Sequence, residues 1–156
     1  MSHTPTFREI EAEDIPAIFE VRVAAWQNER GAEELVQLGI TPASVLELLA
    51  TSHRGWLCEF DARVVGFAIG NRENGEMWVI AVRPEHEGRG IGRRLLRLVE
   101  DWLFAAGWPD IWLTTDADET FRAVGFYRRL GWIDWKLEPG GDRFMKKLRG
   151  PEERAT

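Results

Sequence analysis

Three glycines and three arginines gather within seven residues, in a chain whose formal net charge is −6. They are Gly88, Arg89, Gly90, Gly92, Arg93 and Arg94. They lie between a strand-like apolar segment and a helical one, where unpaired N–H groups and the positive end of the helix dipole favour an anion. Glycine lets anionic oxygens approach the main chain, and arginine adds charged donors. The cluster therefore predicts a local binding site for a phosphate-like anion.

Two common glycine-rich nucleotide-binding motifs do not fit this cluster. A Walker loop needs Lys followed by Ser or Thr, whereas Gly92 is followed by Arg93, and a dinucleotide fingerprint needs a third glycine where Arg93 stands. A purely structural turn is the remaining alternative, but three glycines in five residues are unfavourable at a helix start. Arg97 is assigned a simpler role, an ion pair with Glu100 or Asp101 on a solvated helix face.

Chain length and apolar content indicate one folded unit. The 156 residues allow one sizeable core and are too few for two ordinary domains, so we expect a single domain over residues 1–149. Residues 150–156 are expected to form a frayed tail. The N-terminal segment lacks the apolar core of a secretory signal, and the longest apolar runs are strand-length. The sequence thus predicts a soluble, cytoplasmic protein with no membrane partner.

Charge and cysteine content exclude two further classes of function. A net charge of −6 argues against nucleic-acid binding, which needs a broad positive face. The single cysteine, Cys58, cannot form an internal disulfide and has no Cys or His at ligand spacing, so no metal site is expected. Cys58 is assigned to the core. His53 and His86 are interpreted as surface residues.

Apolar periodicity and turn residues predict seven strands and four helices. The expected segments are a strand at 6–10, a helix capped by Asp14 and ending near Gly31, a helix after Thr41-Pro42, strands at 56–60, 64–70 and 77–82, a helix at 91–106, a strand at 111–115, a helix at 120–130 and strands at 132–137 and 143–148. This order indicates an α/β protein in which helices cover one mixed sheet.

Two motifs resemble those of one known family. The pattern V-x-P-x-x-E-G-R-G-I-G-R-x-L-L (82–96) resembles the acyl-CoA-binding motif of the GNAT superfamily of N-acetyltransferases. Downstream, A-x-G-F-Y-R-R-L-G-W (123–132) is similar to the second motif of that family, and the resemblance covers nearly the whole chain. It implies the GNAT-like acyl-CoA N-acyltransferase fold and an enzyme that uses acetyl-CoA. Such an enzyme would acetylate a primary amine of a small molecule or peptide by direct attack.

The resemblance also implies a set of cofactor contacts. The backbone of residues 87–93 would cradle the pyrophosphate of coenzyme A, and the pantetheine arm would lie along the strand that ends at residue 82, like an added strand. The residues assigned to the cofactor are Ile80, Ala81, Val82, Glu87, Gly88, Arg89, Gly90, Ile91, Gly92, Arg93 and Thr120. Two of them depart from the family pattern: Glu87 stands where Gln or Arg is usual, and Thr120 replaces a frequent asparagine.

Glu76 is the candidate general base, because acyl transfer to an amine requires the amine to be neutral. By strand alternation it is expected on the same face as Trp78, Ile80 and Val82. It lies eleven residues before Glu87, like the catalytic glutamate of the histone-acetylating branch of the family. A solvent-exposed glutamate beside the preceding turn is an equally good interpretation.

Tyr127, the single tyrosine of the chain, aligns with the general acid of the family. A phenol is a weaker acid than a thiol, so complete proton donation to the leaving thiolate is uphill by about 2 kcal/mol. We therefore expect Tyr127 to act by a hydrogen bond to the developing thiolate. Simple packing of an aromatic residue on an amphipathic helix is the alternative.

The acceptor site is expected between the first two helices and the last hairpin. Trp26 and Asn28 are the candidate substrate-binding residues, although ordinary packing by Trp26 would account for its presence as well. The habit of the family suggests a homodimer. A different class of function also fits the motifs, namely a non-catalytic acyl-CoA-binding sensor or interaction module.

Overall fold

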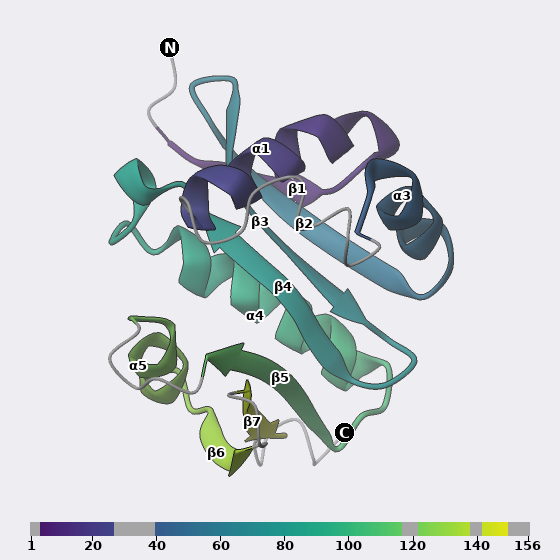
Figure 1. Ribbon diagram of the computed structural model, residues 1–156, viewed down its shortest axis with the longest axis vertical. Coiled ribbons are helices and arrows are strands. Elements are labelled where there is room, and N and C mark those ends of the chain that lie inside the picture. The colour runs from purple at the N-terminus through teal and green to yellow at the C-terminus, as the bar shows by residue number, and fades with distance from the viewer. Residues whose placement is uncertain (1–3, 27–39, 117–121, 138–141, 150–156) are drawn as a thin grey trace.

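The computed structural model describes residues 4–26, 40–116, 122–137 and 142–149 (Figure 1). Its strands form one seven-stranded sheet in the order β1-β2-β3-β4-β5-β7-β6. The strands are β1 (Thr6–Glu9), β2 (His53–Phe60), β3 (Arg63–Asn71), β4 (Glu76–Val82), β5 (Asp110–Asp116), β6 (Ile133–Leu137) and β7 (Asp142–Leu148). The helices are α1 (Ile15–Trp26), α3 (Pro42–Thr51), α4 (Ile91–Ala105) and α5 (Arg122–Arg129), with short 3₁₀ turns η1 (Ala12–Asp14) and η2 (Pro84–His86).

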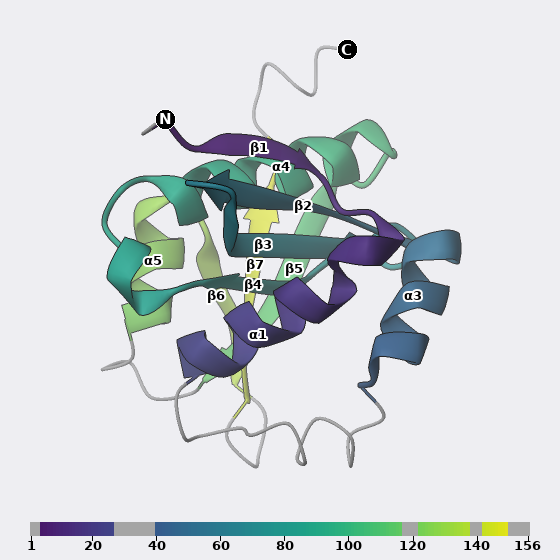
Figure 2. The same cartoon turned by 90° about the horizontal axis from the view of Figure 1, so that it is seen from above.

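The helices cover both faces of the sheet, as the sequence predicts for a mixed α/β protein. Helices α1 and α3 lie on one side and α4 on the other, with α5 beyond the carboxyl ends of β4 and β5 (Figures 1 and 2). The predicted order of strands and helices is confirmed wherever the chain is described. The predicted end of the first helix near Gly31 and the start of the last helix at Thr120 lie outside the described residues.

Capping at two helix starts follows the sequence in one case and departs from it in the other. The Thr41 hydroxyl accepts the Ser44 N–H at 3.1 Å, and Pro42 follows as the first helical residue, so the predicted cap of α3 is confirmed. Asp14 does not cap α1 as predicted. Its carboxylate closes η1 instead by accepting the Glu11 N–H at 2.7 Å, and it pairs with Arg8 at 2.8 Å.

Two apolar cores flank the sheet. One lies under α4, which contributes Ile91, Leu95, Leu96, Val99, Leu103 and Phe104, and the other lies under α1 and α3. Cys58 is buried as predicted, and burial raises the pKa of its thiol to about 11. His53 is only 8% exposed, so its assignment to the surface is wrong; its ring packs edge-on against Trp78. None of the described helices is both long and apolar enough to cross a lipid bilayer.

A β-bulge in β4 overturns the predicted alternation of that strand. Met77 pairs with Gly70 and Val79 pairs with Ile69, so Trp78 is an extra residue on β4. Met77 packs in the α4 core, whereas Trp78 and Val79 both pack on the α1 and α3 side. Glu76 therefore does not share a face with Ile80 and Val82 as predicted. Alternation back from Met77 places it with Trp78 on the α1 and α3 side.

Strands β4 and β5 pair only at their amino ends. Their parallel register contains the single pair Glu76 and Trp112, after which the two strands diverge (Figure 1). Among the described strands, none pairs with this edge of β4 along residues 77–82. This divergence leaves that edge of β4 open between the two strands.

The turn between β2 and β3 contains two residues with positive φ, and the strain at one of them can be tested by substitution. Asp61 and Ala62 have φ values of 52° and 63°, the left-handed region in which an L-residue other than Asn or Asp is strained. Ala62→Gly is expected to raise the free energy of unfolding by about 0.5–1 kcal/mol, measured by urea denaturation. Ala105→Gly at the exposed last residue of α4 is the control, because the backbone there is right-handed and the same change should not raise stability. A neutral or destabilising Ala62→Gly would contradict the strain.

Candidate functional site

The glycine-rich loop leaves open space at the start of α4. Gly88 and Gly90 have φ values of 80° and 81°, and a Cβ built on either would meet no atom within 4 Å. The first helical hydrogen bond runs from the Arg94 N–H to the Gly90 carbonyl at 3.1 Å. The N–H groups of the residues between them thus have no acceptor within the helix. Space without side chains beside free N–H groups fits a pyrophosphate group.

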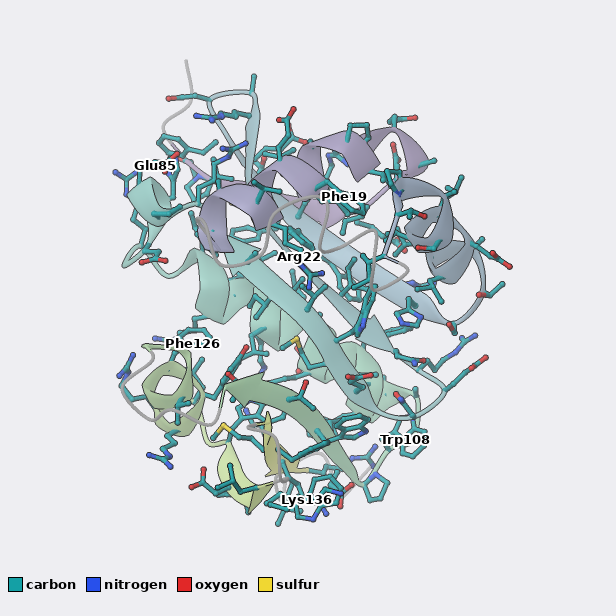
Figure 3. The ribbon with its side chains drawn as sticks, in the orientation of Figure 1. Phe19, Arg22, Glu85, Trp108, Phe126 and Lys136 are labelled. Carbon is teal, nitrogen blue, oxygen red and sulfur yellow. The ribbon has the colours of Figure 1, made fainter. Side chains whose placement is uncertain are left out.

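Gly92 differs from the other two glycines because α5 packs near it. A Cβ at Gly92 would lie 3.5 Å from the Phe126 ring and 3.6 Å from the Val82 side chain. Figure 3 shows Phe126 on α5 beside the start of α4. Gly92 therefore lies at the contact between α4, α5 and the end of β4, whereas Gly88 and Gly90 border open space.

A cavity of about 310 Å³ joins this loop to α5. It is lined by Ile80, Ala81, Val82, His86, Glu87, Gly88, Gly90, Gly92, Arg93, Phe126, Tyr127 and Arg129. Nine of these residues are among those that the sequence assigned to a site. Arg89 and Ile91 were assigned too but lie outside the lining: the Arg89 guanidinium lies 5.7 Å from the centre of the Phe60 ring, and Ile91 is 2% exposed in the α4 core.

Sequence reasoning missed three lining residues, His86, Phe126 and Arg129. Phe126 and Arg129 flank Tyr127 in the second motif, so their place in the motif was the available signal. His86, which the sequence assigns to the surface, lies in η2 at the edge of the cavity, with its ring 5.4 Å from that of Phe60. His86 belongs to neither a strand nor a long helix, so no apolar periodicity in the sequence distinguishes a place at the cavity edge from a place on the open surface.

Tyr127 is held inside the cavity wall by α5 and the segment that follows. Its side chain is 6% exposed, and its carbonyl accepts the N–H groups of Leu130 and Trp132, each at 3.0 Å. Burial raises the pKa of the phenol above its ordinary value, so the hydroxyl remains protonated at physiological pH. The group can therefore donate a hydrogen bond into the cavity.

Glu76 begins β4 and lies outside the cavity lining. Burial raises the pKa of its carboxyl, while a hydrogen bond from the Asn74 side chain lowers it. The alternative of a solvent-exposed glutamate is wrong, because the residue is half-buried. Two indoles fix the turn before it: Trp108 donates to the Arg72 carbonyl at 2.7 Å and Trp112 to the Asn74 carbonyl at 2.9 Å. Figure 3 shows Trp108 at this end of the sheet.

The remaining predicted residues are only partly described. Trp26 is the last residue of α1, and both Asn28 and Thr120 lie outside the described residues. Among the residues that the structure describes, no group of three or more His, Cys, Asp or Glu side chains is placed to hold a metal ion.

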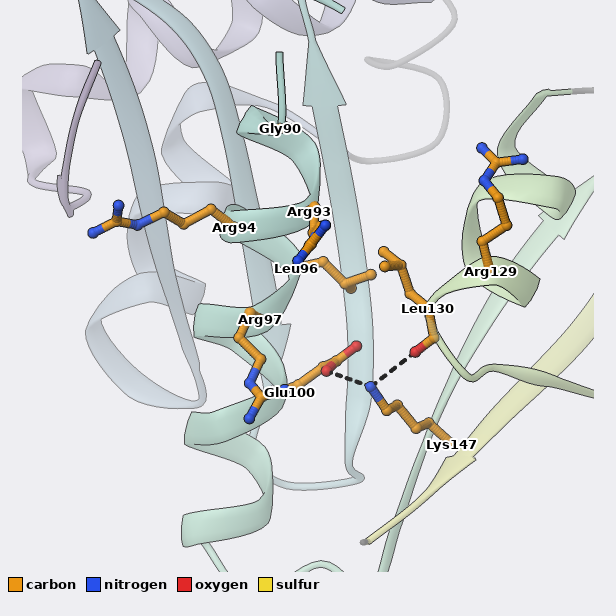
Figure 4. Close-up of a pocket in the computed structure, with 9 residues that line it drawn as sticks. All are labelled: Gly90, Arg93, Arg94, Leu96, Arg97, Glu100, Arg129, Leu130 and Lys147. Atoms are coloured by element: carbon orange, nitrogen blue, oxygen red, sulfur yellow. Dashed lines mark hydrogen bonds and ion pairs between the residues drawn. The ribbon is translucent and has the colours of Figure 1, made fainter. Parts of the chain in front are cut away.

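A basic groove continues from the cavity along α4. It has a volume of about 720 Å³ and shares Gly90, Arg93 and Arg129 with the cavity (Figure 4). Its other lining residues are Arg94, Leu96, Arg97, Glu100, Leu130 and Lys147. Arg97 pairs with Asp101 at 3.1 Å, one of the two predicted partners. The other, Glu100, is buried and pairs with Lys147 instead. Positive charge thus gathers around the loop despite the acidic chain.

Curated relatives share only part of their length with this chain. A mycothiol acetyltransferase of Pseudarthrobacter chlorophenolicus is 41% identical over 64 residues, which cover 41% of this chain and 20% of the relative. An uncharacterised N-acetyltransferase of Methanocaldococcus jannaschii is 34% identical over 86 residues, 54% of this chain and 55% of that protein. The chain therefore spans between about a fifth and about half of these two curated relatives.

A solved structure and a family model cover much more of the chain. The crystal structure of PaiA N-acetyltransferase from Thermoplasma acidophilum in complex with coenzyme A superposes with a TM-score of 0.81 at 18% identity, over 94% of this chain and 99% of the other. At this identity the likeness shows the fold. The model described as Acetyltransferase (GNAT) family matches residues 15–132, about three quarters of the sequence. This chain therefore belongs to the GNAT family of acetyltransferases, which use acetyl-CoA as acyl donor.

Proposed function

We propose that this chain transfers an acetyl group from acetyl-CoA to a primary amine of a small molecule or peptide by direct attack. The observation that supports this most strongly is the cavity that joins the open glycine loop, the free edge of β4 and the buried Tyr127. Acyl transfer needs these three elements together, because the donor must be held by its anionic end, aligned along its arm and activated at its sulfur.

The donor would be held mainly by the main chain. Open space at Gly88 and Gly90 and the N–H groups at the start of α4 suit the pyrophosphate, and Arg93 adds positive charge at the same point. The free edge of β4 at residues 80–82 offers N–H and C=O groups to the amide-bearing arm. When bound, acetyl-CoA supplies a thioester carbonyl as the electrophile.

Glu76 would accept the proton of the incoming amine. From reference pKa values, roughly one lysine-type amine in 2,500 is neutral at pH 7, compared with roughly one α-amine in ten. A buried carboxylate with a raised pKa is a stronger base than an exposed one, which suits this task. Because Glu76 lies on the α1 and α3 side of the sheet, the amine would approach from that side.

Tyr127 would stabilise the departing thiolate with a hydrogen bond. Its raised pKa makes full proton transfer to sulfur more uphill than the difference of about 2 kcal/mol between a free phenol and a free thiol. A hydrogen bond to sulfur requires only that the hydroxyl be protonated, which burial ensures. This mode of action therefore agrees with the environment of the phenol.

The decisive experiment measures thiol release from acetyl-CoA with a panel of amino acids, polyamines, aminoglycosides and peptides. At least one amine should be acetylated, and Tyr127→Phe should lower kcat at least about tenfold while the Kd for CoA changes less than about twofold. CoA binding without turnover on any amine would favour the sensor alternative. Wild-type kcat in the Tyr127→Phe enzyme would contradict the assigned role of Tyr127.

The glycine loop can be tested by filling its open space. Gly90→Ala adds a methyl group where the pyrophosphate is proposed, and we expect at least about tenfold weaker CoA binding by calorimetric titration. Gly107→Ala is the matched control, because Gly107 also has a positive φ, of 107°, and no atom within 4 Å, but follows the other end of α4. Both variants should lose stability from backbone strain. Equal CoA affinity in the two would refute the loop assignment.

The pH dependence of Glu76→Gln tests the base. The wild-type advantage in kcat should be about 10- to 100-fold near pH 8 and should shrink as pH falls through the raised pKa of Glu76, because the wild-type carboxylate becomes protonated. The raised pKa also means that ionising Glu76 destabilises the folded state. Glu76→Gln should therefore be more stable than wild type at pH 7, with the difference vanishing near pH 4.

Glu47→Gln is the control for this comparison, since Glu47 is an exposed glutamate on α3. It should leave both the rate profile and the stability profile unchanged. A constant ratio of wild-type to Glu76→Gln rates across pH would remove Glu76 as the base.

A further inference from the structure

Glu100 is a buried carboxylate on α4 that faces the segment after α5, the helix that carries Tyr127. It lies on α4 and is 3% exposed, on the core side of a helix whose other buried residues are apolar. An ionised carboxylate is costly to bury unless other groups compensate its charge. An apolar residue of similar size would often serve stability equally well at such a position, so packing alone does not explain a glutamate here.

Each oxygen of the carboxylate accepts a hydrogen bond from another part of the chain. Its Oε2 accepts the Trp132 Nε1–H at 2.9 Å, and its Oε1 accepts the Lys147 ammonium at 2.8 Å. The same ammonium donates to the Leu130 carbonyl at 3.0 Å (Figure 4). The network thus connects α4, the segment after α5 and β7 through charge-assisted hydrogen bonds, which are directional.

The network bonds Leu130 and Trp132, and both of these residues also contact Tyr127. Leu130 and Trp132 donate their N–H groups to the Tyr127 carbonyl, and the Trp132 ring lies 6.0 Å from the Tyr127 ring, centre to centre. The described part of α5 is eight residues long, and a helix this short depends on tertiary contacts for its position. The last turn of α5, and the phenol on it, are therefore located by contacts that lead back to Glu100.

We propose that Glu100 is a positioning residue that sets the place of the Tyr127 hydroxyl in the cavity. The inference rests on the proposed function for its catalytic consequence, but the position of the ring can be tested without turnover. Glu100 is not among the residues that line the cavity with the loop glycines and Tyr127, so its effect on kcat should pass through Tyr127.

A spectroscopic experiment tests the position directly. Tyr127 is the single tyrosine, so ¹³C-tyrosine labelling gives one set of ring signals. Glu100→Gln keeps the size of the side chain and removes its charge, and it should shift or broaden these signals. Ile111→Val, which trims a buried β5 residue in the same core, should leave them unchanged. Signals identical to wild type in Glu100→Gln would overturn the proposal, whatever the enzymatic activity.

Kinetics supply the second arm, at a temperature where all variants are folded. Glu100→Gln should lower kcat roughly tenfold. In a Tyr127→Phe background the same substitution should lower kcat no further, whereas a general loss of packing would lower it by the same factor again. That second result would overturn the proposal. If Tyr127→Phe alone retains wild-type kcat, the proposed function of Tyr127 fails, and the ring signals still decide the positioning.

Lys147→Met provides an independent variant if Glu100→Gln does not fold. It removes the ammonium donor to Glu100 and to the Leu130 carbonyl, and it leaves the Trp132 ring beside Tyr127. It should reproduce the change in the Tyr127 ring signals and the fall in kcat. Unchanged ring signals in this variant would likewise overturn the proposal.

Discussion

The site depends on the failure of β4 and β5 to pair beyond their first residues. Their parallel ladder contains one pair, Glu76 and Trp112, and the free edge of β4 from there to residue 82 is available to a ligand. Backbone N–H and C=O groups need hydrogen-bond partners, and an unpaired strand edge is the simplest surface on which an extended chain can find them. A continuous ladder here would have closed the sheet and removed the binding surface.

Helix positions at the open end of the sheet turn this edge into a site. Helix α4 brings its amino terminus and the loop glycines to the end of β4, and α5 brings Tyr127 to the same place. Side chains on the two faces of β4 then have different surroundings. The bulge at Trp78 separates Glu76 from Ile80 and Val82, so the proposed base and the donor-side residues lie on opposite faces.

Local charge around the site opposes the charge of the whole chain. The net charge is −6, yet arginines and a lysine line the groove that continues from the glycine loop. Within a Debye length of about 8 Å at physiological ionic strength, these nearby groups affect an anionic ligand more than the distant acidic residues do. The Glu100 carboxylate is buried and bonded to Trp132 and Lys147, so its negative charge is balanced by that lysine and the arginines supply the net positive charge of the groove.

The sequence by itself determined the order of strands and helices, the cap of α3, the burial of Cys58 and the glycine loop at the start of α4, because each follows from local periodicity or local backbone chemistry. Only the tertiary structure decided the face on which Glu76 lies, the burial of His53, the ion pair of Asp14 with Arg8 and the bonds of Glu100 to Trp132 and Lys147. The face of Glu76 depends on strand register, where one extra residue at Trp78 reverses the faces. The bonds of Glu100 join residues far apart in the chain, and the pair of Asp14 with Arg8 forms only when the chain folds back after β1, so no local periodicity encodes them.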